Sequence, residues 1–456
     1  MDEQQQPQPP FESGGGDEVD IERLFEPGNE EALKAYLRLL QHPADVAELF
    51  HLVDESHWRQ LTRYLSAETF AQVLRHLDEG QRGLLGEVLG AERLTEVIDE
   101  LETDDAADVL ADLPPDKADE VLKAIADRAE IELLLAYPTD SAGGIMQKEV
   151  CRVQRGANVR AAIEAVRRAR ERIEDILEVY VVDWAGRLRA TLTLEDLVLS
   201  EDDVPIDTLS HAVEHVAYPE MDQEEVAQMF GKYDLFSLPV INQKGVLLGR
   251  ITFDDIQDVV EEEASEDIMA MAGTSDEEFV YGTEFFRIAM FRLPWLVTAM
   301  LGSLATGFLL SLFDYFPGDA IVLAAFVPTV MAMTGNLGSQ SAMIITRGLA
   351  TGRVDLDTLG RSLVRELLVA FIMGAVVGGA VGLLAHVWKQ HAVLGLAVGA
   401  SIVASMTVAA LVGVAAPALF KKIGIDPAIA AGPLVTTGCD LLGVGIYLLV
   451  ALLLLS

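Results

Sequence analysis

Cysteine is almost absent from this chain of 456 residues, which contains only Cys151 and Cys439. Two cysteines exclude a disulfide framework, and a free Cys151 agrees with a reducing compartment for the soluble part of the chain. The N-terminus also lacks the basic and apolar regions of a signal peptide. Residues 1–20 are rich in Gln, Pro, Gly and acidic side chains, which bury little apolar surface, so we expect a disordered tail there.

Basic side chains are also scarce, with 33 Lys and Arg against 72 Asp and Glu and a formal net charge of −39. From Phe286 onward the chain has nine basic and seven acidic side chains, so the preceding 285 residues have the other 24 and 65. The protein is therefore an acidic soluble half followed by a nearly neutral apolar half. An acidic surface repels phosphate, which excludes nucleic acid as a partner and makes cations the expected ones.

Residues 21–137 have apolar side chains at three- and four-residue spacing, with short breaks such as Pro114-Pro115. This pattern predicts an all-α N-terminal domain, a bundle or superhelix that acts as a scaffold. A local group of carboxylates is the one functional feature that we note there. Within that group, Asp104 and Asp108 are spaced to share one face of a helix. Its other members are Asp99, Glu100 and Asp105.

An internal repeat follows, in which residues 180–197 align without gaps on residues 239–256. Each copy reads as a strand, a turn at Gly186 or Gly245, a second strand, and then Thr-x-x-Asp at the start of a helix. A helical segment precedes each strand pair. The two copies therefore predict a pair of similar α/β domains.

This pattern resembles a tandem pair of CBS domains over residues 138–262. The resemblance implies a regulatory module that binds a small ligand, often an adenine nucleotide or a metal. If a nucleotide such as ATP binds, Thr252 and Asp255 are the expected contacts on the ribose side. The alternative is a purely dimerising module with an empty cleft.

An acidic connector, residues 263–287, joins the repeat to the apolar half. A run of charges is most often a solvated face, but apolar residues such as Ile268 and Met271 recur between the charged turns. We therefore expect a long acidic helix at the cytoplasmic mouth of the membrane domain.

Residues 288–456 contain five apolar segments, each at or above the ~20 residues that a helix needs to span the hydrocarbon. Arg and Lys lie before the first segment and in the loops after the second and fourth, which predicts a cytoplasmic N-terminus and an outer C-terminus. We thus expect a five-helix transmembrane domain. Its predicted spans are Ile288–Phe313, Ala320–Ile345, Leu363–Trp388, Val393–Phe420 and Pro427–Leu455.

Asp440 is the only charged residue between Asp426 and the C-terminus. A lone carboxylate at membrane depth costs at least ~2.5–3.5 kcal/mol, so it marks an ion or proton path by default. Thr436 lies on the same helical face, four residues earlier, and adds a hydroxyl oxygen. Such oxygens suit hard cations such as Mg²⁺ and Ca²⁺. The alternative is that Asp440 only cross-links two helices.

The second span contains Pro328, Gly335 and Gly338, so we expect a broken helix there. Irregular backbone at membrane depth is tolerated only where protein or a water-filled cavity covers it. Asn336, between the two glycines, adds a neutral oxygen. Ordinary hydrogen bonding between helices is the alternative role for these polar residues.

The order of the domains, together with Gly335-Asn-Leu-Gly-Ser-Gln340 and Gly432-Pro-Leu-Val-Thr-Thr-Gly-Cys-Asp440, resembles the MgtE-type magnesium channels. The resemblance covers essentially the whole chain after the tail. It implies a homodimer in the cell membrane with one central pore, gated by cytosolic Mg²⁺. Asp440 then matches the pore aspartate of the family, with Asn336 and Thr436 beside it. The implied regulatory metal ligands are Asp99, Asp222, Glu224, Asp234, Asp255, Glu263, Glu266 and Asp267.

The residues support a channel of this kind. Mg²⁺ usually keeps several waters, so one Asp440 from each subunit would hold a hydrated ion weakly enough to release it. At low divalent concentration the acidic half repels itself. Bound Mg²⁺ would draw the N-domain, the CBS pair and the connector together and close the pore, which is negative feedback on import.

Two other functions stay open. A proton- or Na⁺-coupled carrier needs a second site, for which Glu366 is a weak candidate because its neighbour Arg365 favours an interfacial ion pair. A non-conducting sensor of metal or nucleotide predicts no flux at all. Oxygen sites bind several hard ions, so Mn²⁺, Co²⁺ and Ca²⁺ remain alternatives to Mg²⁺. The spans lack an HExxH motif, a Ser–His pair and paired catalytic aspartates, so we expect no enzyme.

Overall fold

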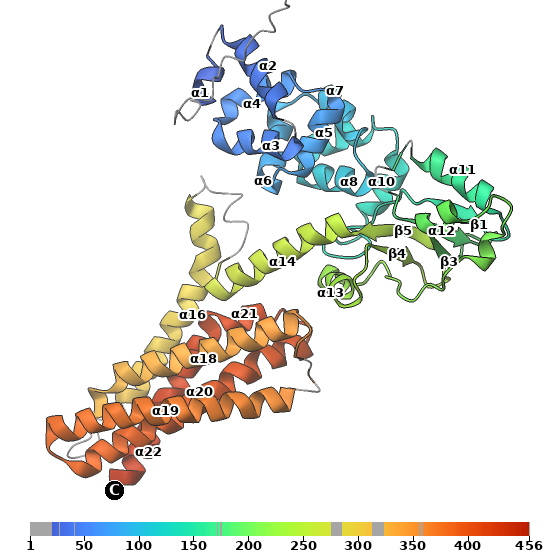
Figure 1. The fold of residues 1–456 in the computed structure, drawn as a ribbon. Helices are drawn as coiled ribbons and strands as arrows, with labels where there is room; N and C mark the ends of the chain where they lie inside the picture. The colour runs from blue at the N-terminus through green and yellow to red at the C-terminus, as the bar shows by residue number, and fades with distance from the viewer. Residues whose placement is uncertain are drawn as a thin grey trace, which may run out of the picture. The chain divides into compact units, whose positions relative to one another are not determined.

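The computed structural model describes residues 21–26, 28–40, 42–170, 172–173, 176–274, 285–311, 323–354, 356 and 359–455. The chain divides into two compact units, Met1–Val259 and Val260–Ser456. Figure 1 shows the first unit as a helical region followed by small sheets, and the second unit as long helices. The domain boundaries given above within these units stay predictions.

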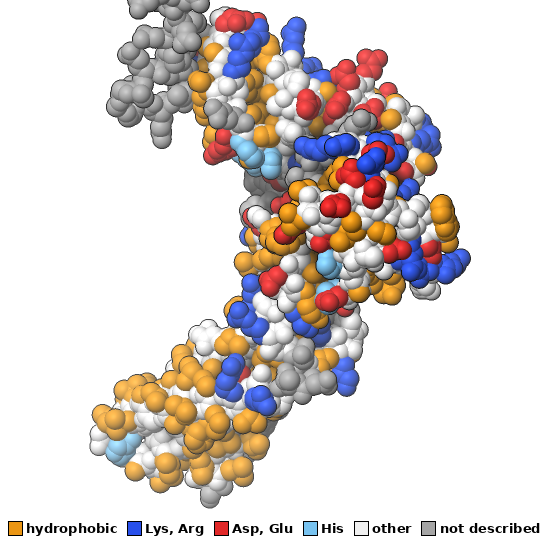
Figure 2. Space-filling model, turned by 45° about the vertical axis from the view of Figure 1, so that its right-hand side comes forward, with side chains coloured by type: hydrophobic (Ala, Val, Ile, Leu, Met, Phe, Trp, Pro, Cys, Tyr) orange, Lys and Arg blue, Asp and Glu red, His pale blue; other side chains and the backbone are white. Residues whose placement is uncertain are grey.

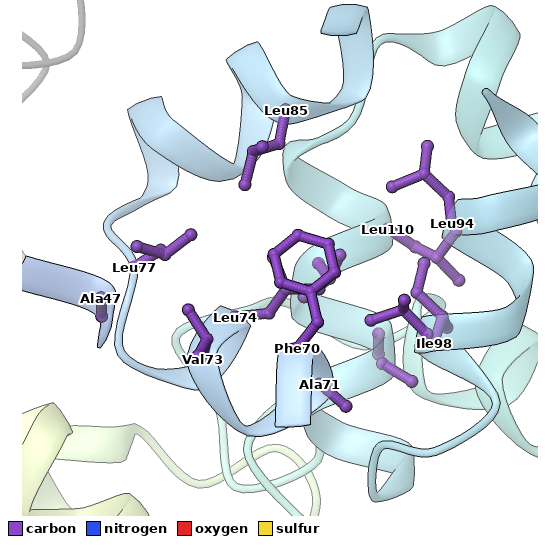
Figure 3. Close-up of a cluster of buried hydrophobic side chains, with 14 of the residues drawn as sticks. Ala47, Phe70, Ala71, Val73, Leu74, Leu77, Leu85, Leu94, Ile98 and Leu110 are labelled. Atoms are coloured by element: carbon purple, nitrogen blue, oxygen red, sulfur yellow. The ribbon is translucent and has the colours of Figure 1, made fainter. Parts of the chain in front are cut away.

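Short helices form the first part of the first unit, as the apolar spacing predicts. Side chains cap several of them: Ser66 accepts a hydrogen bond from the Thr69 amide at 3.1 Å, and Asp78 accepts one from the Gln81 amide at 2.8 Å. Figure 3 shows Phe70 and Leu74 within the core that these helices bury together. The helices are α1 (Ile21–Leu24), α2 (Glu30–Leu39), α3 (Pro43–Leu52), η1 (Glu55–His57), α4 (Trp58–Arg63), α5 (Ala67–Arg75), α6 (Glu79–Val88), α7 (Ala91–Ile98), α8 (Thr103–Asp112), α9 (Pro115–Leu122) and α10 (Arg128–Leu134).

The repeat folds as two antiparallel hairpins, with Gly186 and Gly245 at positive φ in their turns. The hairpins hydrogen-bond to each other at these turns, since the Leu188 amide donates to Gly245 and the Leu247 amide donates to Gly186. The predicted α/β pair is thereby confirmed. Its elements are β1 (Arg152–Gln154), α11 (Val159–Ala169), β2 (Glu178–Val182), β3 (Leu188–Thr193), α12 (Leu194–Leu199), η2 (Ile206–Thr208), α13 (Gln223–Tyr233), β4 (Ser237–Ile241) and β5 (Leu247–Thr252). Strand β1 pairs with β2 in parallel.

The acidic helix begins before the connector that the sequence predicts over residues 263–287. Helix α14 (Phe253–Ala272) begins directly after β5, because Thr252 starts it as a capping residue, and it ends before Gly273 at φ 76°. Residues 275–284 lie outside the described residues. The acidic helix is thus continuous with the second hairpin copy rather than a separate element.

The second unit consists of long helices. Among the described residues, four of these helices are long and apolar enough to cross a membrane. These four are α16 (Phe285–Ser311), α19 (Leu359–Lys389), α20 (Ala392–Lys422) and α22 (Pro433–Leu455). Figure 2 shows hydrophobic side chains over this lobe, with Lys and Arg gathered at one end of it. The remaining predicted span is α18 (Val327–Ala350), a helix of 24 residues whose Thr, Asn, Ser and Gln side chains make it less apolar.

The expected break in α18 is wrong. Pro328 lies in the first turn, where a missing amide leaves no hydrogen bond unmade, and Gly335 and Gly338 lie inside a continuous helix. The break occurs instead at Gly432, between the short α21 (Ala428–Ala431) and α22.

Candidate functional site

Asp440 lies on α22 at the wall of a cavity of about 360 Å³ within the second unit. Its Oδ1 atom is buried and has no hydrogen-bond partner in the described part of the chain. The other cavity residues are mostly small or hydroxyl-bearing, and none of them is charged. They are Met271, Ala299, Gly302, Ser303, Ser339, Met343, Ala431, Gly432, Pro433, Thr436 and Thr437.

Helix α18 packs against the Asp440 carboxylate. A Cβ atom at Gly335 would lie 3.0 Å from Asp440 Oδ1 and 3.2 Å from Thr436 Cγ2, so the glycine lets the carboxylate approach the helix backbone. One turn along α18, the Ser339 hydroxyl lies 2.8 Å from Thr436 Oγ1. The structure therefore brings Asp440 and Thr436 together, as the sequence predicts, and adds Gly335 and Ser339.

Asn336 does not line this cavity. Its side chain is exposed on α18, as is that of Gln340 one turn later. A polar side chain turned toward lipid would lose its hydrogen bonds with water. The single chain thus leaves a polar strip on a helix of the membrane unit.

The last turn of α14 packs against the break before α22. A Cβ atom at Gly432 would lie 2.6 Å from the Met271 carbonyl oxygen, so the absent side chain permits this close approach. Met271 also lines the cavity that holds Asp440. The end of the acidic helix therefore lies at the wall of the cavity that holds Asp440.

Asp267 on α14 lies near a carboxylate that sequence reasoning missed. Burial raises the pKa of Asp267 to about 6, and the charges of Asp426 and Glu263 add to the effect, while Arg347 and Lys421 oppose it. Glu266 lies beside Asp267 on the same helix. Asp426 lies just before α21. One feature of the sequence could have identified it as a candidate site residue: it is the last acidic residue before the final span.

A second group of carboxylates lies in the first unit, where α8 meets the start of α14. Burial, together with Asp255, Asp105 and Glu102, raises the pKa of Asp104 well above its usual range. Burial likewise raises the pKa of Asp255 to about 7 and that of Asp105 to about 6. Asp104 Oδ1 is buried without a hydrogen-bond partner among the residues described.

Arg75 neutralises only part of this group. Its guanidinium contacts Asp105 at 2.9 Å and Asp254 at 3.4 Å. Asp104 is 4% exposed, and no cation of the described chain pairs with it. Asp104 and Asp105 of α8 both interact electrostatically with Asp255. The sequence predicts Asp99, from a neighbouring helix, for the regulatory set.

Asp99 has a different position. Its Oδ1 accepts a hydrogen bond from the Ala126 amide at 2.9 Å, and its side chain lines a polar cavity of about 510 Å³ in the first unit. Asp222 and Asp234 lie at the two ends of α13, roughly 18 Å apart by helical rise. Glu224 follows Asp222 in the first turn.

No group of three His, Cys, Asp or Glu side chains lies close enough to hold a metal ion, among the residues that the structure describes. The regulatory ligand set therefore stays a prediction.

The two Thr–Asp pairs of the repeat have different surroundings. Thr252 is 4% exposed, and both its amide and its hydroxyl donate to Asp255 Oδ2. The Asp255 carboxylate in turn lies near the acidic residues of α8. In the first copy, Thr193 donates in the same way to Asp196, whose Oδ2 also lies 3.0 Å from His211 Nε2. Thr252 and Asp255 remain the predicted nucleotide contacts, although the pair in the first copy is the more open one.

Three family models match parts of this chain. Residues 327–450 match the MgtE model, described as a divalent cation transporter. Residues 41–140 match the MgtE intracellular N domain, and residues 210–262 match a CBS domain.

Curated relatives match nearly the whole chain. The magnesium transporter MgtE of Thermus thermophilus is 34% identical over 446 residues, which cover 96% of this chain and 98% of that protein. This chain belongs to the MgtE family. The magnesium transporter MgtE of Bacillus subtilis is 30% identical over 407 residues, covering 89% of this chain and 90% of that protein.

A solved structure resembles the first unit of this MgtE family member. The cytosolic domain of the Mg²⁺ channel MgtE in complex with ATP is 32% identical with a TM-score of 0.50, covering 53% of this chain and 99% of that one. Family membership confirms the predicted resemblance, the multidomain fold class and the expectation of a transporter rather than an enzyme. It also agrees with a cytoplasmic N-domain.

Proposed function

We propose that this protein conducts Mg²⁺ across the cell membrane along a path in which Asp440 binds the ion. The observation that carries the proposal is the unpartnered Oδ1 of Asp440 at the wall of a cavity lined by neutral small and hydroxyl-bearing side chains. A carboxylate in that position lacks a compensating charge, and a passing cation supplies one. The names of the relatives support Mg²⁺ as the cargo.

The ion would pass with much of its water shell. A single carboxylate cannot replace the octahedral hydration of Mg²⁺, which dehydrates reluctantly. Ser339 and Thr436, which lie 2.8 Å apart through their hydroxyl oxygens, offer hydrogen bonds to the bound waters. Such weak, outer contacts allow the ion to leave as readily as it enters.

The working form in this proposal is a homodimer. Asn336 and Gln340 lie exposed on α18, a helix of the membrane unit, and a second copy would cover them. In that arrangement Asn336 would come to the ion path from the subunit interface, and two Asp440 side chains would share one ion. The loop charges support a cytoplasmic first unit and a C-terminus outside. In this proposal the membrane potential drives Mg²⁺ inward, down its electrochemical gradient.

Cytosolic Mg²⁺ would close the path by relieving repulsion between carboxylates. In the first unit it would bridge Asp104 and Asp255, joining the N-domain to the second hairpin copy. In the second unit it would bridge Asp267 and Asp426, fixing the end of α14 against the cavity. Asp99, Asp222, Glu224, Asp234, Glu263 and Glu266 complete the proposed regulatory set.

A nucleotide is the second proposed ligand. The ATP complex of a similar cytosolic domain supports an adenine nucleotide at the CBS pair. Thr252 would contact the ribose only after its surroundings move, because it is buried in this structure, whereas Asp255 is half-buried.

Uptake into liposomes tests the path. We expect Asp440→Asn to lower Mg²⁺ uptake by about 100-fold or more, since it removes the one charge among the described residues that line the cavity. Competing Mn²⁺, Co²⁺ and Ca²⁺ measure selectivity in the same assay. Equal uptake by the wild type and the variant would remove Asp440 from the path.

Two further measurements separate the alternatives. A proton- or Na⁺-coupled carrier would require that ion for uptake, whereas a channel would follow the membrane potential alone. A non-conducting sensor would give no flux in either case. In patch-clamp recordings we expect millimolar Mg²⁺ on the cytoplasmic face to lower the open probability, and an unchanged value would refute the gating.

A further inference from the structure

Glu366 is a buried carboxylate in a membrane helix that the proposed path does not use. It is 7% exposed and lies on α19 at the start of the face that is turned into the helix bundle. The other buried residues of this face have very small side chains or none: Ala370, Gly374, Gly378, Gly382 and Ala385. A single large, charged side chain on such a face is costly, so it needs a specific partner.

That partner is on α18. The Ser341 hydroxyl donates a hydrogen bond to Glu366 Oε2 at 3.2 Å, and Ser341 is 1% exposed. Arg365 also contacts the carboxylate, with 3.4 Å between Nη2 and Oε1, but the side chain of Arg365 is 64% exposed. The expected interfacial ion pair is therefore only part of the arrangement. Its buried part links α19 to α18.

The link lies at the back of the helix that faces Asp440. Ser341 is two residues after Ser339, which places the two side chains about 200° apart around α18. On the front, Ser339 contacts Thr436, and Gly335 admits the Asp440 carboxylate. A rotation of α18 that broke the Ser341 bond would also move Gly335 and Ser339 relative to α22.

We propose that Glu366 is a positioning residue for the cation path. By accepting the Ser341 hydrogen bond it fixes the rotation of α18, and so it sets the space between α18 and the Asp440 carboxylate. This space determines how well Mg²⁺, with its rigid octahedral water shell, is distinguished from Ca²⁺, whose coordination is larger and more flexible. The inference rests on the proposed role of Asp440.

The test is Mg²⁺ uptake by the full chain in liposomes with Ca²⁺ as competitor. We expect Ser341→Ala and Glu366→Ala each to lower the half-inhibiting Ca²⁺ concentration about three- to tenfold, the equivalent of one hydrogen bond. The double variant should show no larger effect than either single variant. Glu366→Gln keeps an acceptor for the hydroxyl and should stay within about twofold of the wild type.

Ser401→Ala is the matched control. Ser401 is also fully buried in a membrane helix, but its hydroxyl donates within α20, to the Ala397 carbonyl at 2.6 Å. We expect this variant to keep the wild-type Ca²⁺ inhibition. If Ser341→Ala behaves like Ser401→Ala, the positioning role is refuted, even where Glu366→Ala fails to fold. It is also refuted if Glu366→Gln is as impaired as Glu366→Ala while Ser341→Ala is normal.

Asp440→Asn in the same assay separates the two proposals. If Asp440→Asn transports normally, the path itself is wrong. If it abolishes uptake while Ser341→Ala matches its control, only the role of Glu366 fails.

Discussion

Asp440 and Asp104 share an unusual feature and differ in everything around it. Each has its Oδ1 atom buried without a hydrogen-bond partner among the residues described. Asp104 lies among other carboxylates in the first unit, with Asp255, Asp105 and Glu102 acting on it. Asp440 lies in the second unit, at a cavity whose other described lining residues are all uncharged.

The difference indicates two uses of a cation. Several carboxylates that repel one another gain a large free energy when a divalent ion joins them, so the ion stays and changes the conformation. One carboxylate in neutral surroundings attracts an ion and can release it. We therefore expect changes near Asp440 to alter the amount of flux, and changes near Asp104 to alter its control.

The largest effect that separates the two regions is expected from Gly335→Ala. The new Cβ atom would lie 3.0 Å from Asp440 Oδ1, so either the carboxylate or α18 must shift. We expect Mg²⁺ uptake to fall about tenfold or more, with the cytosolic Mg²⁺ concentration needed for closure unchanged.

Gly379→Ala on α19 is the matched control, because no atom lies within 4 Å of a Cβ atom placed there. It should transport normally. Uptake equal to the wild type in Gly335→Ala would mean that the contact between α18 and Asp440 is not part of the path.

A smaller effect, on the closure of the channel rather than on its conduction, is expected from Asp104→Asn. The amide keeps the shape but removes one charge from the buried group, so α8 and the start of α14 stay together without a divalent ion. We expect closure at a cytosolic Mg²⁺ concentration about three- to tenfold lower, with the single-channel current unchanged. Patch-clamp recordings measure both quantities.

Asp108→Asn is the control for this change, because Asp108 is exposed on the same helix. It should keep the wild-type concentration dependence. A lower single-channel current in Asp104→Asn would contradict the comparison, since Asp104 would then affect conduction itself.

The sequence predicts much of the fold because its signals are local. Three- and four-residue spacing predicts the helices of the first unit, and the ungapped repeat predicts both hairpins, down to the turns at Gly186 and Gly245. The unbroken α18 was missed for a physical reason. Glycine inside a helix weakens it locally, but packing against neighbouring helices decides the outcome, and here Gly335 gives room to Asp440.

The candidate site was predicted less completely, since it depends on contacts between distant segments. Asp440 stands out by its charge alone, and Thr436 by its spacing. Nothing in the sequence distinguishes Asp104 from Asp99, because which of them faces Asp255 depends on how α8 packs. The same holds for Asp426 beside Asp267 and for Ser341 beside Glu366.

The smallest expected effect is the pH dependence that the carboxylates of the first unit produce. The folded-state pKa of Asp255, about 7, and that of Asp105, about 6, lie above the ordinary value of about 3.9. Between these values the folded protein binds more protons than the unfolded chain, so the free energy of unfolding falls as pH rises through this window. Lowering the pH from 8 to 6 without Mg²⁺ should therefore stabilise the first unit by about 1 kcal/mol, or ~2–4 °C in its melting temperature. Calorimetry of the full chain measures this shift.

Mg²⁺ at pH 8 should replace the protons and reduce the shift in melting temperature. Asp104→Asn should also reduce it, whereas Asp108→Asn should not. A melting temperature that rises from pH 6 to pH 8 would show that these carboxylates are already compensated, which would remove the contrast with Asp440.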